Sequence, residues 1–404
     1  MLKHVHGRFA IAPCNILETR IAFDRQNYDI LQWNSFQPNN HDPLAQFNSF
    51  VATLRRAIRR HPSTTIVLCI GRDDQSCLHV AAVLLGGFLI LEEQTGFDQV
   101  AAAFRSVDTG FDQKLAGFLQ DSSVHDCWRA LIHARRLGWM QLFRDMAMPT
   151  PIPSNDVSFM VDEQPELEEM LHYASPVNGD VHMVVPGKIL CFPTPAVLQD
   201  DRLWTDEETA EGWMARRFSA AFFANLFADL GVEVAMCLHA SAYDRAAFLA
   251  QGIEVEDLGA DPAGPHMLRA IDRFLAVAAA APGLVALQSG AEDGPGHLVA
   301  LVLSYLTSRL GFEPESAVAW IAMAHPALLA PPGGPDRGPP GPVMPPIATV
   351  MEGDGRELPR AASASAGGVA AGGRWWLSAK ARPAAPLAFR RVMSSPGRLP
   401  LLAV

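Results

Sequence analysis

The 404-residue sequence contains no CxxC pair, and its six cysteines are scattered along the chain. This spacing fits neither a disulfide framework nor a zinc site, and it favours a reducing compartment. The N-terminal segment MLKHVHGRFAIAPCN lacks a secretory hydrophobic run. The two longest apolar stretches, 80–91 and 298–306, are too short to span a bilayer. We therefore expect an intracellular protein that does not bind membranes.

Positive charge is also scarce. The chain has 32 Lys and Arg against 43 Asp and Glu, and its formal net charge is -11. This balance excludes a protein that coats nucleic acid with a basic surface. Apolar material is plentiful, because 49% of the residues are hydrophobic. The chain can therefore bury a sizeable core, and its length suggests two or three domains.

The segment 331–404 differs in composition from the rest of the chain. It contains 13 prolines and 11 glycines, and its nine Lys or Arg against four Asp or Glu give it a net charge of about +5. Few of its aliphatic residues recur at a helical or strand period. We predict a disordered, mildly basic tail. Within it, Trp375 and Trp376 are either an anchor for a partner or two solvated aromatics.

Two segments of the body echo each other. Residues 63–91 and 282–310 each read as a short aliphatic run, a small polar loop with Gly and Asp, and an apolar run of helical period. A strand, a tight loop and a helix is the simplest interpretation. Such a loop directs backbone N–H groups toward a helix N-terminus, which is a natural anion site. The repeat predicts two α/β domains of one architecture rather than a short-period solenoid.

Further elements fit α/β domains. Asp42 is expected to cap a helix that begins at Pro43, and 148–165 reads as a linker. The remaining expectations follow from periodicity and turn residues. They are a strand, Pro-Gly turn and strand at 181–192, a strand at 232–238, and helices at 42–60, 122–142, 208–229 and 267–280.

Several short stretches occur in a distinctive order. They are DPLAQFNSF, IVLCIGRDDQSC, HYASPVNGDVHMVVPGKILCF, YDRAAFLAQGIEVEDL, AIDRFLAV and PESAVAWIAMAHP. Their order and spacing over roughly 8–330 resemble the cell-division-cycle fourteen family of dual-specificity protein phosphatases. The resemblance implies two tandem α/β domains of the protein-tyrosine-phosphatase fold, each a central sheet flanked by helices. The implied parts are a non-catalytic domain at 8–150, an acidic linker helix at 151–177, a catalytic-type domain at 178–330 and the tail at 331–404.

The active-site loop of that family reads HCxxGxxR, and this sequence departs from it. Aligned without gaps, Ser289 occupies the position of the nucleophilic cysteine, Glu292 that of the loop glycine and Pro295 that of the phosphate-binding arginine. The Gln-containing distal loop of the family is replaced by 329–333, LAPPG.

Each departure weakens the expected chemistry. A serine hydroxyl is not ionised as a cysteine thiolate is, and the motif offers no adjacent base. Pro295 removes charge-assisted bonds to phosphate and one backbone donor. Glu292, beside Asp293, places negative charge where a phosphate dianion would sit. The loop therefore predicts an inactive site.

Other parts of the implied site are ambiguous. Ungapped alignment places Pro262 at the general-acid position, and a shift of one residue places Asp261 there. Asp261 is either a remnant of that acid or an ordinary loop residue before proline. The acidic segment DEQPELEE, which includes Glu166, Glu168 and Glu169, corresponds to the acidic groove through which the family receives basic Ser-Pro peptides. It is otherwise a solvated helix start.

No other motif points to chemistry. His4 and His6 form an HxH pair without a further ligand nearby, and GxSxG is absent. We expect no metal and no cofactor.

The sequence thus predicts an inactive pseudophosphatase that serves as a scaffold or binding module for phosphorylation-regulated proteins. The alternative is an active dual-specificity phosphatase acting on phosphoserine, phosphothreonine and phosphotyrosine. A misread exon that replaced the active-site loop is a third explanation, since Ala, Gly and Pro rise after about residue 255. The resemblance implies phosphoproteins or basic Pro-directed peptides as partners, without nucleic acid or membrane. It also implies a role in the cell cycle, mitotic exit or cytokinesis, and a location in nucleus, cytoplasm, centrosome or basal body. The oligomeric state stays open.

Overall fold

The structure is a computed structural model. It describes residues 3–13, 28–32, 43–60, 62–70, 75–105, 122–139, 172–199, 202–208, 214–238, 245–259, 265–289 and 295–329. All of them belong to one compact unit, Met1–Ile347. The predicted tail 331–404, the linker 148–165 and the acidic segment 162–169 lie outside the described residues.

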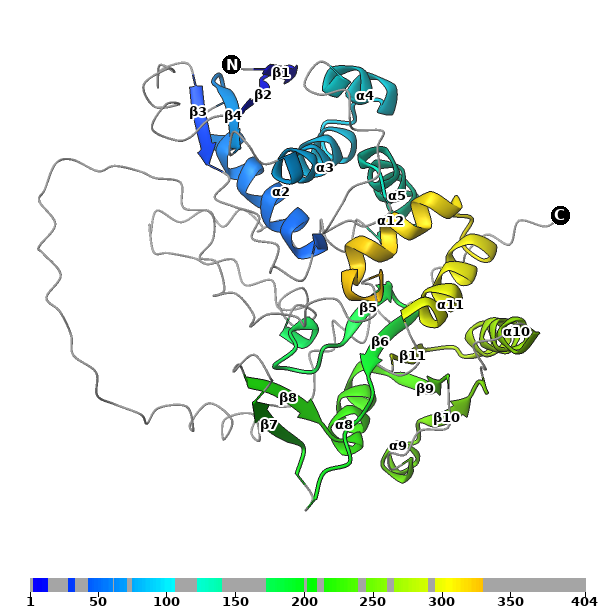
Figure 1. The fold of residues 1–404 in the computed structure, drawn as a ribbon. Coiled ribbons are helices and arrows are strands. Elements are labelled where there is room, and N and C mark those ends of the chain that lie inside the picture. Colours follow the sequence, from blue (N-terminus) through cyan, green and yellow to red (C-terminus); the bar gives the residue numbers. More distant parts are fainter. Residues whose placement is uncertain are drawn as a thin grey trace, which may run out of the picture. The chain divides into compact units, whose positions relative to one another are not determined.

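The first sheet has four strands in the order β1-β2-β4-β3 (Figure 1). Strand β1 is antiparallel to β2, whereas β4 runs parallel to both of its neighbours. Helix α2 begins at Pro43, as predicted. The elements of this part are β1 (Lys3–His6), β2 (Phe9–Pro13), β3 (Tyr28–Gln32), α2 (Pro43–Arg60), β4 (Thr65–Ile70), α3 (Gln75–Leu91), α4 (Phe97–Arg105) and α5 (Val124–Arg136).

The second sheet has five strands in the order β10-β9-β11-β6-β5. Only β5 is antiparallel to its neighbour, and a Pro-Gly turn with Gly187 at φ 72° joins it to β6 as predicted. The other three pairs are parallel. The elements are β5 (His182–Val185), β6 (Ile189–Pro193), α8 (Ala220–Leu230), β9 (Val232–Cys237), α9 (Ala246–Ala250), β10 (Glu254–Asp257), α10 (Pro265–Ala280), β11 (Leu284–Ser289), α11 (Pro295–Ser308), α12 (Pro314–Ala324) and the 3-10 helix η2 (Pro326–Leu329).

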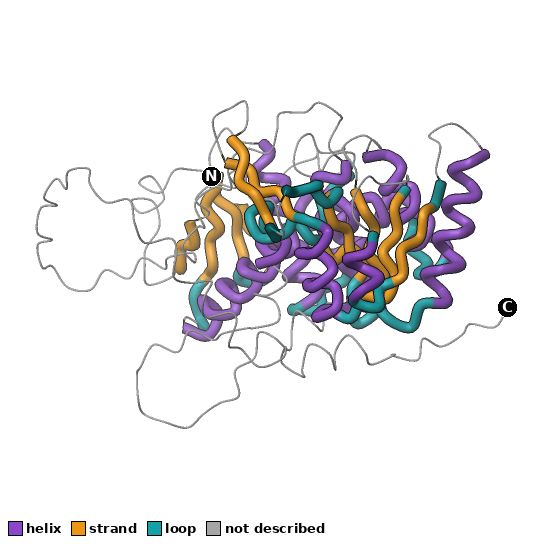
Figure 2. Tube along the Cα trace, turned by 90° about the horizontal axis from the view of Figure 1, so that it is seen from below, coloured by secondary structure: helices purple, strands orange, loops and turns teal. Residues whose placement is uncertain are grey.

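The two sheets share one strand plan. In each, an antiparallel hairpin lies beside a central parallel strand, β4 or β11, which leads through a few residues into an apolar helix, α3 or α11. Figure 2 shows the strands of both sheets with helices packed beside them. The predicted echo of 63–91 and 282–310 is therefore confirmed as two strand-to-helix units at matching places. The predicted fold class, central sheets flanked by helices in two tandem α/β domains, is confirmed as well.

The core follows from these apolar runs. Helix α3 is apolar on all sides and is buried throughout 80–91, as expected for a helix enclosed by neighbours. Trp128 of α5 lies against it, with its indole nitrogen 3.2 Å from the carbonyl oxygen of Ala82. The capping box of Ser123 and Asp126 fixes the start of α5.

The predicted helix at 208–229 is wrong in its first half. Residues Trp204–Glu208 and Met214–Phe218 form the antiparallel strands β7 and β8, and the helix α8 begins only at Ala220. Arg216 donates to both carboxylate oxygens of Asp206, at 2.7 and 3.0 Å, and lies 5.5 Å from the ring of Trp204. These cross-strand contacts override the helix propensity of the segment.

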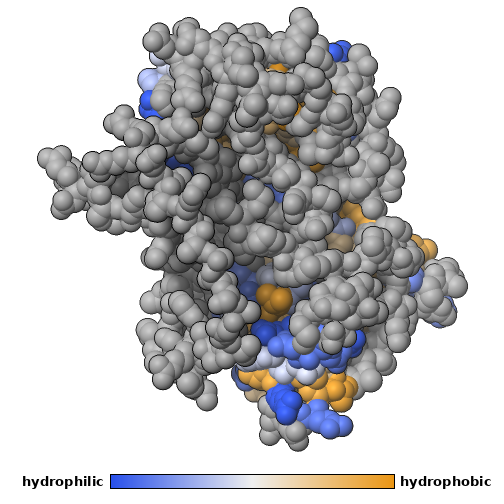
Figure 3. Space-filling view, turned by 60° about the vertical axis from the view of Figure 1, so that its left-hand side comes forward, coloured by the Kyte–Doolittle hydropathy of each residue, from blue (hydrophilic) through white to orange (hydrophobic). Residues whose placement is uncertain are grey.

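The surface carries few large apolar side chains. Among the described residues, the exposed ones are Val197, Leu203, Leu249 and Leu268. Figure 3 shows hydrophobic and hydrophilic side chains next to one another in the lower part of the face it draws. None of the described helices combines the length and the apolar character that crossing a bilayer requires.

The contact of Gly86 with Trp128 predicts a stability effect. A Cβ atom at Gly86 would come within 2.3 Å of the Trp128 ring, which its hydrogen bonds to Ala82 and Val83 hold in place. We expect Gly86→Ala to lower the free energy of unfolding by roughly 1–3 kcal/mol through overpacking, measured by urea unfolding. The control is Gly296→Ala, a helical position where a Cβ would meet nothing within 4 Å. A Gly86→Ala variant as stable as the unchanged chain would contradict this packing.

Candidate functional site

Four parallel strands of the second sheet end at one edge, which we call the carboxyl edge. These are β6, β11, β9 and β10, and their last residues are Pro193, Ser289, Cys237 and Asp257. In open α/β sheets, ligands bind outside the carboxyl ends of the strands. We therefore expect a ligand-binding site at the carboxyl edge.

The structure places the flanks of the loop that the sequence singled out. Ser289 is the last residue of β11 and pairs with Pro193, and Pro295 is the first residue of α11. Residues 290–294 and the side chains of Ser289 and Pro295 lie outside the described part. Proline suits the first turn of a helix because its missing N–H is not needed there. For the same reason Pro295 cannot donate a backbone hydrogen bond to an anion.

Gln288 lies at the base of the loop, just before Ser289. Its side chain is buried, and its amide nitrogen donates to the Thr194 hydroxyl at 2.9 Å. The family motif has histidine at this position. The contact joins β11 to the segment after β6 through neutral groups, so neither partner contributes a charge to the carboxyl edge.

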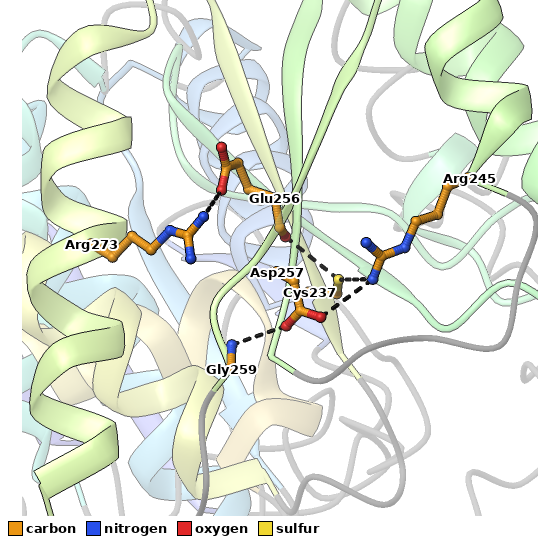
Figure 4. A network of polar contacts seen from close by, with 6 residues as sticks. All are labelled: Cys237, Arg245, Glu256, Asp257, Gly259 and Arg273. Atoms are coloured by element: carbon orange, nitrogen blue, oxygen red, sulfur yellow. Dashed lines mark hydrogen bonds and ion pairs between the residues drawn. The ribbon is translucent and has the colours of Figure 1, made fainter.

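A polar network lies at the ends of β9 and β10 (Figure 4). Arg245 points toward Asp257, with 3.4 Å between its Nη2 and Oδ2, and the same nitrogen lies 3.8 Å from the Cys237 sulfur. The other carboxylate oxygen of Asp257 accepts from the Gly259 N–H at 2.9 Å. Beside this network Arg273 forms an ion pair with Glu256. Arg245, the cation nearest the strand ends in this network, is thus already paired with a carboxylate.

The fold buries the thiols of Cys69, Cys127, Cys191 and Cys237. Cys237 is 1% exposed, and its thiol donates to the Glu256 carbonyl at 3.5 Å. Burial raises the pKa of the Cys191 thiol. It does the same to the pKa of Cys127, with the nearby Asp126 carboxylate adding to the effect. Thiols with raised pKa values stay protonated and unreactive at neutral pH.

Lys188 fixes the approach to β11. Its ammonium group donates to the carbonyls of Ala281 and Gly283, at 2.5 and 3.1 Å, where the chain leaves α10 and enters the strand. A cation at this end of a helix also complements the helix dipole. Burial lowers the pKa of Lys188, and the Glu233 carboxylate opposes that shift. Lys188 is therefore a positioning residue for the strand that ends at Ser289.

The other predicted site residues, Asp261, Glu166, Glu168 and Glu169, lie outside the described residues. Within the described ranges, no three His, Cys, Asp or Glu side chains come close enough together to hold a metal ion.

Comparison with known proteins adds a family resemblance. No protein-family model matches the chain. The chain is 24% identical over 320 residues to the tyrosine-protein phosphatase cdc-14 of Caenorhabditis elegans. That alignment covers 75% of this chain and 39% of the relative. The chain is 27% identical over 257 residues to the dual specificity protein phosphatase CDC14AB of Danio rerio, covering 63% and 38%.

The chain resembles the CDC14 dual-specificity phosphatases. A human relative, the dual specificity protein phosphatase CDC14C, is 22% identical over 163 residues, which is 40% of this chain and 34% of that protein. The resemblance that the sequence motifs indicated is confirmed, and so is a relationship to phosphatases. The chain spans about two fifths of the length of the first two relatives.

Sequence reasoning missed the Arg245–Asp257 pair and the role of Lys188. The strand that ends at Cys237 was predicted, but β10 was not. The sequence therefore gave no reason to expect Asp257 beside Cys237. Lys188 was visible as the residue after a Pro-Gly turn. Its carbonyl partners lie more than 90 residues away, at Ala281 and Gly283.

The contacts of Lys188 generate a prediction. We expect Lys188→Met to lower the free energy of unfolding by about 1–3 kcal/mol, because two partly buried carbonyls lose a charged donor. The measurement is urea unfolding of the full chain at neutral pH. The matched control is Arg56→Met, which removes an exposed cation from α2 and should change stability by no more than about 0.5 kcal/mol. Equal effects of the two changes would show that Lys188 does not hold the start of β11.

Proposed function

We propose that this chain is a catalytically inactive CDC14-type protein that acts as a scaffold or binding module for phosphorylation-regulated proteins. One observation carries the proposal. Ser289 ends the strand β11 and Pro295 begins the helix α11. This supports the alignment in which these two residues occupy the positions of the nucleophilic Cys and the clamping Arg.

The expected loss of rate is large. Removing a catalytic nucleophile costs on the order of 10⁶ in turnover. The lost arginine removes hydrogen bonds worth about 1.5–3 kcal/mol each in charge-assisted form. The described part of the carboxyl edge offers no obvious replacement, because Arg245 is paired with Asp257 and the Gln288–Thr194 contact is neutral.

Binding can persist without catalysis. We propose that 8–150 and 178–330 are the two phosphatase-like domains and that the acidic linker 151–177, with Glu166, Glu168 and Glu169, attracts basic Pro-directed peptides or phosphoproteins. We further propose an intracellular location, in nucleus or cytoplasm, at the centrosome or at the basal body. A role in the cell cycle or mitotic exit rests on the resemblance alone.

The second candidate is an active dual-specificity phosphatase, with Asp261 as general acid. It is favoured by the fold and by the relatives, which are named as phosphatases. The two candidates differ in whether residues at the carboxyl edge bind a phosphate group and supply a nucleophile that attacks its phosphorus atom.

The first prediction of this proposal concerns catalysis. The purified full chain is expected to hydrolyse neither an aryl phosphate nor a phosphoserine peptide above background. Ser289→Cys alone is not expected to restore turnover. Pro295 still provides no guanidinium group to bind the phosphate, and the negative charge of Glu292 still repels it. The triple change Ser289→Cys, Glu292→Gly and Pro295→Arg is the variant in which partial activity is expected.

The matched control for the triple variant is the same protein with Ser289→Ala in place of Ser289→Cys, which keeps the rebuilt clamp without a nucleophile. Turnover by the unchanged chain that Ser289→Ala abolishes would overturn the inactive assignment and favour the second candidate.

The second prediction concerns peptide binding. Basic Pro-directed peptides are expected to bind the full chain with an affinity that falls steeply as salt rises, because exposed charges attract through a screened field. Changing Glu166, Glu168 and Glu169 to Gln should weaken binding several-fold in a fluorescence anisotropy titration. A peptide of the same length with Lys and Arg replaced by Gln is the control. A dissociation constant that does not change with salt concentration would contradict an acidic groove.

A further inference from the structure

Four aromatic side chains meet where the part of the chain that carries the first sheet packs on the part that carries the second. From the first part come His133 of α5 and Trp139, which lies just beyond α5. From the second part come Phe312, in the turn before α12, and Trp320 of α12. The ring centroids of Trp139 and Trp320 are 5.0 Å apart, and those of His133 and Phe312 are 4.2 Å apart. We call these four residues the aromatic junction.

The junction is almost closed to water. Trp320, Phe312 and Trp139 are 0%, 4% and 7% exposed. Phe312 contacts both tryptophans, with 5.7 Å between its ring centroid and that of Trp139 and 6.3 Å to that of Trp320. Around them, buried residues of both parts belong to one continuous hydrophobic core. The two parts therefore meet through a dry apolar contact, in which aromatic side chains contribute much of the packing energy.

Two hydrogen bonds fix the junction to the backbone. Nε2 of His133 donates to the carbonyl of Leu310 at 2.7 Å, across 177 residues of sequence. The next residue, Gly311, has φ 72°, so the accepting carbonyl lies in the turn that joins α11 to α12. The indole N–H of Trp320 donates to the Val184 carbonyl at 2.8 Å. The junction thus ties α5 to the turn after α11 and reaches β5 at the edge of the second sheet.

These contacts make the stability of each part depend on the other. If the first part unfolded alone, Phe312 and Trp320 would be exposed to water, and the Leu310 carbonyl would lose its donor. If the second part unfolded alone, Trp139 and His133 would lose the same partners. Domains joined by a small polar surface move and unfold separately, whereas a buried hydrophobic contact opposes separation. Partial unfolding is therefore costly in either direction.

We propose that the aromatic junction makes the two α/β parts of the chain one cooperative unit, in which a loss of stability in one part is transmitted in full to the other. This coupling goes beyond the proposed function and does not depend on it.

The test is hydrogen–deuterium exchange of the full chain, read by mass spectrometry at the slowest-exchanging amides of β4 and β11. Such amides exchange through the largest opening of the structure, so their rates report the free energy of that opening. Ile11→Val removes one buried methylene group from β2 in the first part. We expect exchange roughly twofold to tenfold faster in β4, and faster by the same factor in β11. Ile189→Val in β6 is the reciprocal change, with the same expectation.

A second variant assigns the coupling to the junction. In a chain that also carries Trp139→Leu, the effect of Ile11→Val should fall mainly on β4, because the largest ring that the first part contributes is lost. The matched control is Trp204→Leu, the same change in the strand β7 outside the junction, which should keep equal factors in β4 and β11.

Two results would overturn the proposal. One is faster exchange in β4 with an unchanged rate in β11 when Ile11→Val is the only change, which decides the matter without any junction variant. The other is equal factors in β4 and β11 when Trp139→Leu is present, which would place the coupling outside the junction. If Trp139→Leu does not fold, His133→Phe replaces it, since this change keeps a ring but removes the hydrogen bond to Leu310, and the factor in β11 should again fall below that in β4.

Discussion

Each sheet of this protein is organised around one central parallel strand that ends where a helix is about to begin. Strands β4 and β11 are buried along nearly their whole length between two neighbours, and each is followed within a few residues by a helix. Because parallel strands point the same way, their neighbours end at the same edge. The carboxyl edge and the Gln288–Thr194 contact depend on the place of β11 in the sheet, and the Cys237–Arg245–Asp257 network lies at the same edge, at the ends of β9 and β10.

The two sheets are also joined through their helices. Trp139, just beyond α5, lies 5.0 Å from Trp320 of α12 and 5.7 Å from Phe312, measured between ring centroids. His133 of α5 adds a hydrogen bond to the Leu310 carbonyl at 2.7 Å. The Trp320 indole N–H also donates to the Val184 carbonyl of β5 at 2.8 Å, so the packing of the first part reaches the sheet that carries the candidate site. A chain without catalysis would still keep this framework, because none of these contacts needs a nucleophile.

Much of the fold could be predicted from the sequence, because apolar runs of strand and helix length are local signals. The two strand-to-helix units, the hairpin of β5 and β6, and the starts of α2 and β9 followed from periodicity, Pro, Gly and capping residues. The hairpin of β7 and β8 could not, since its stability comes from Arg216 reaching Asp206 and Trp204 across the strands. Glu and Ala in that segment favour a helix locally, and only the tertiary contacts reverse the preference.

The candidate site divides in the same way. The loop position was visible in the sequence, because the motif fixes the spacing of Ser289 and Pro295 between a strand and a helix. The Arg245–Asp257 pair and the contacts of Lys188 with Ala281 and Gly283 were not, because each joins residues whose contact only the folded chain creates. Asp261 and the acidic linker remain predictions.

We propose that the carboxyl edge has kept the strand-to-helix frame of a phosphatase and has lost the ability to hold phosphate. Isothermal titration of the full chain with tungstate, a tetrahedral oxyanion that imitates phosphate, tests this claim most directly. We expect no saturable heat of binding, because the proposed alignment puts Pro295 at the position of the clamping arginine and adds the negative charge of Glu292 to the loop. A single saturable site of micromolar affinity, lost when Ser289 or its neighbours in the loop are changed, would contradict it.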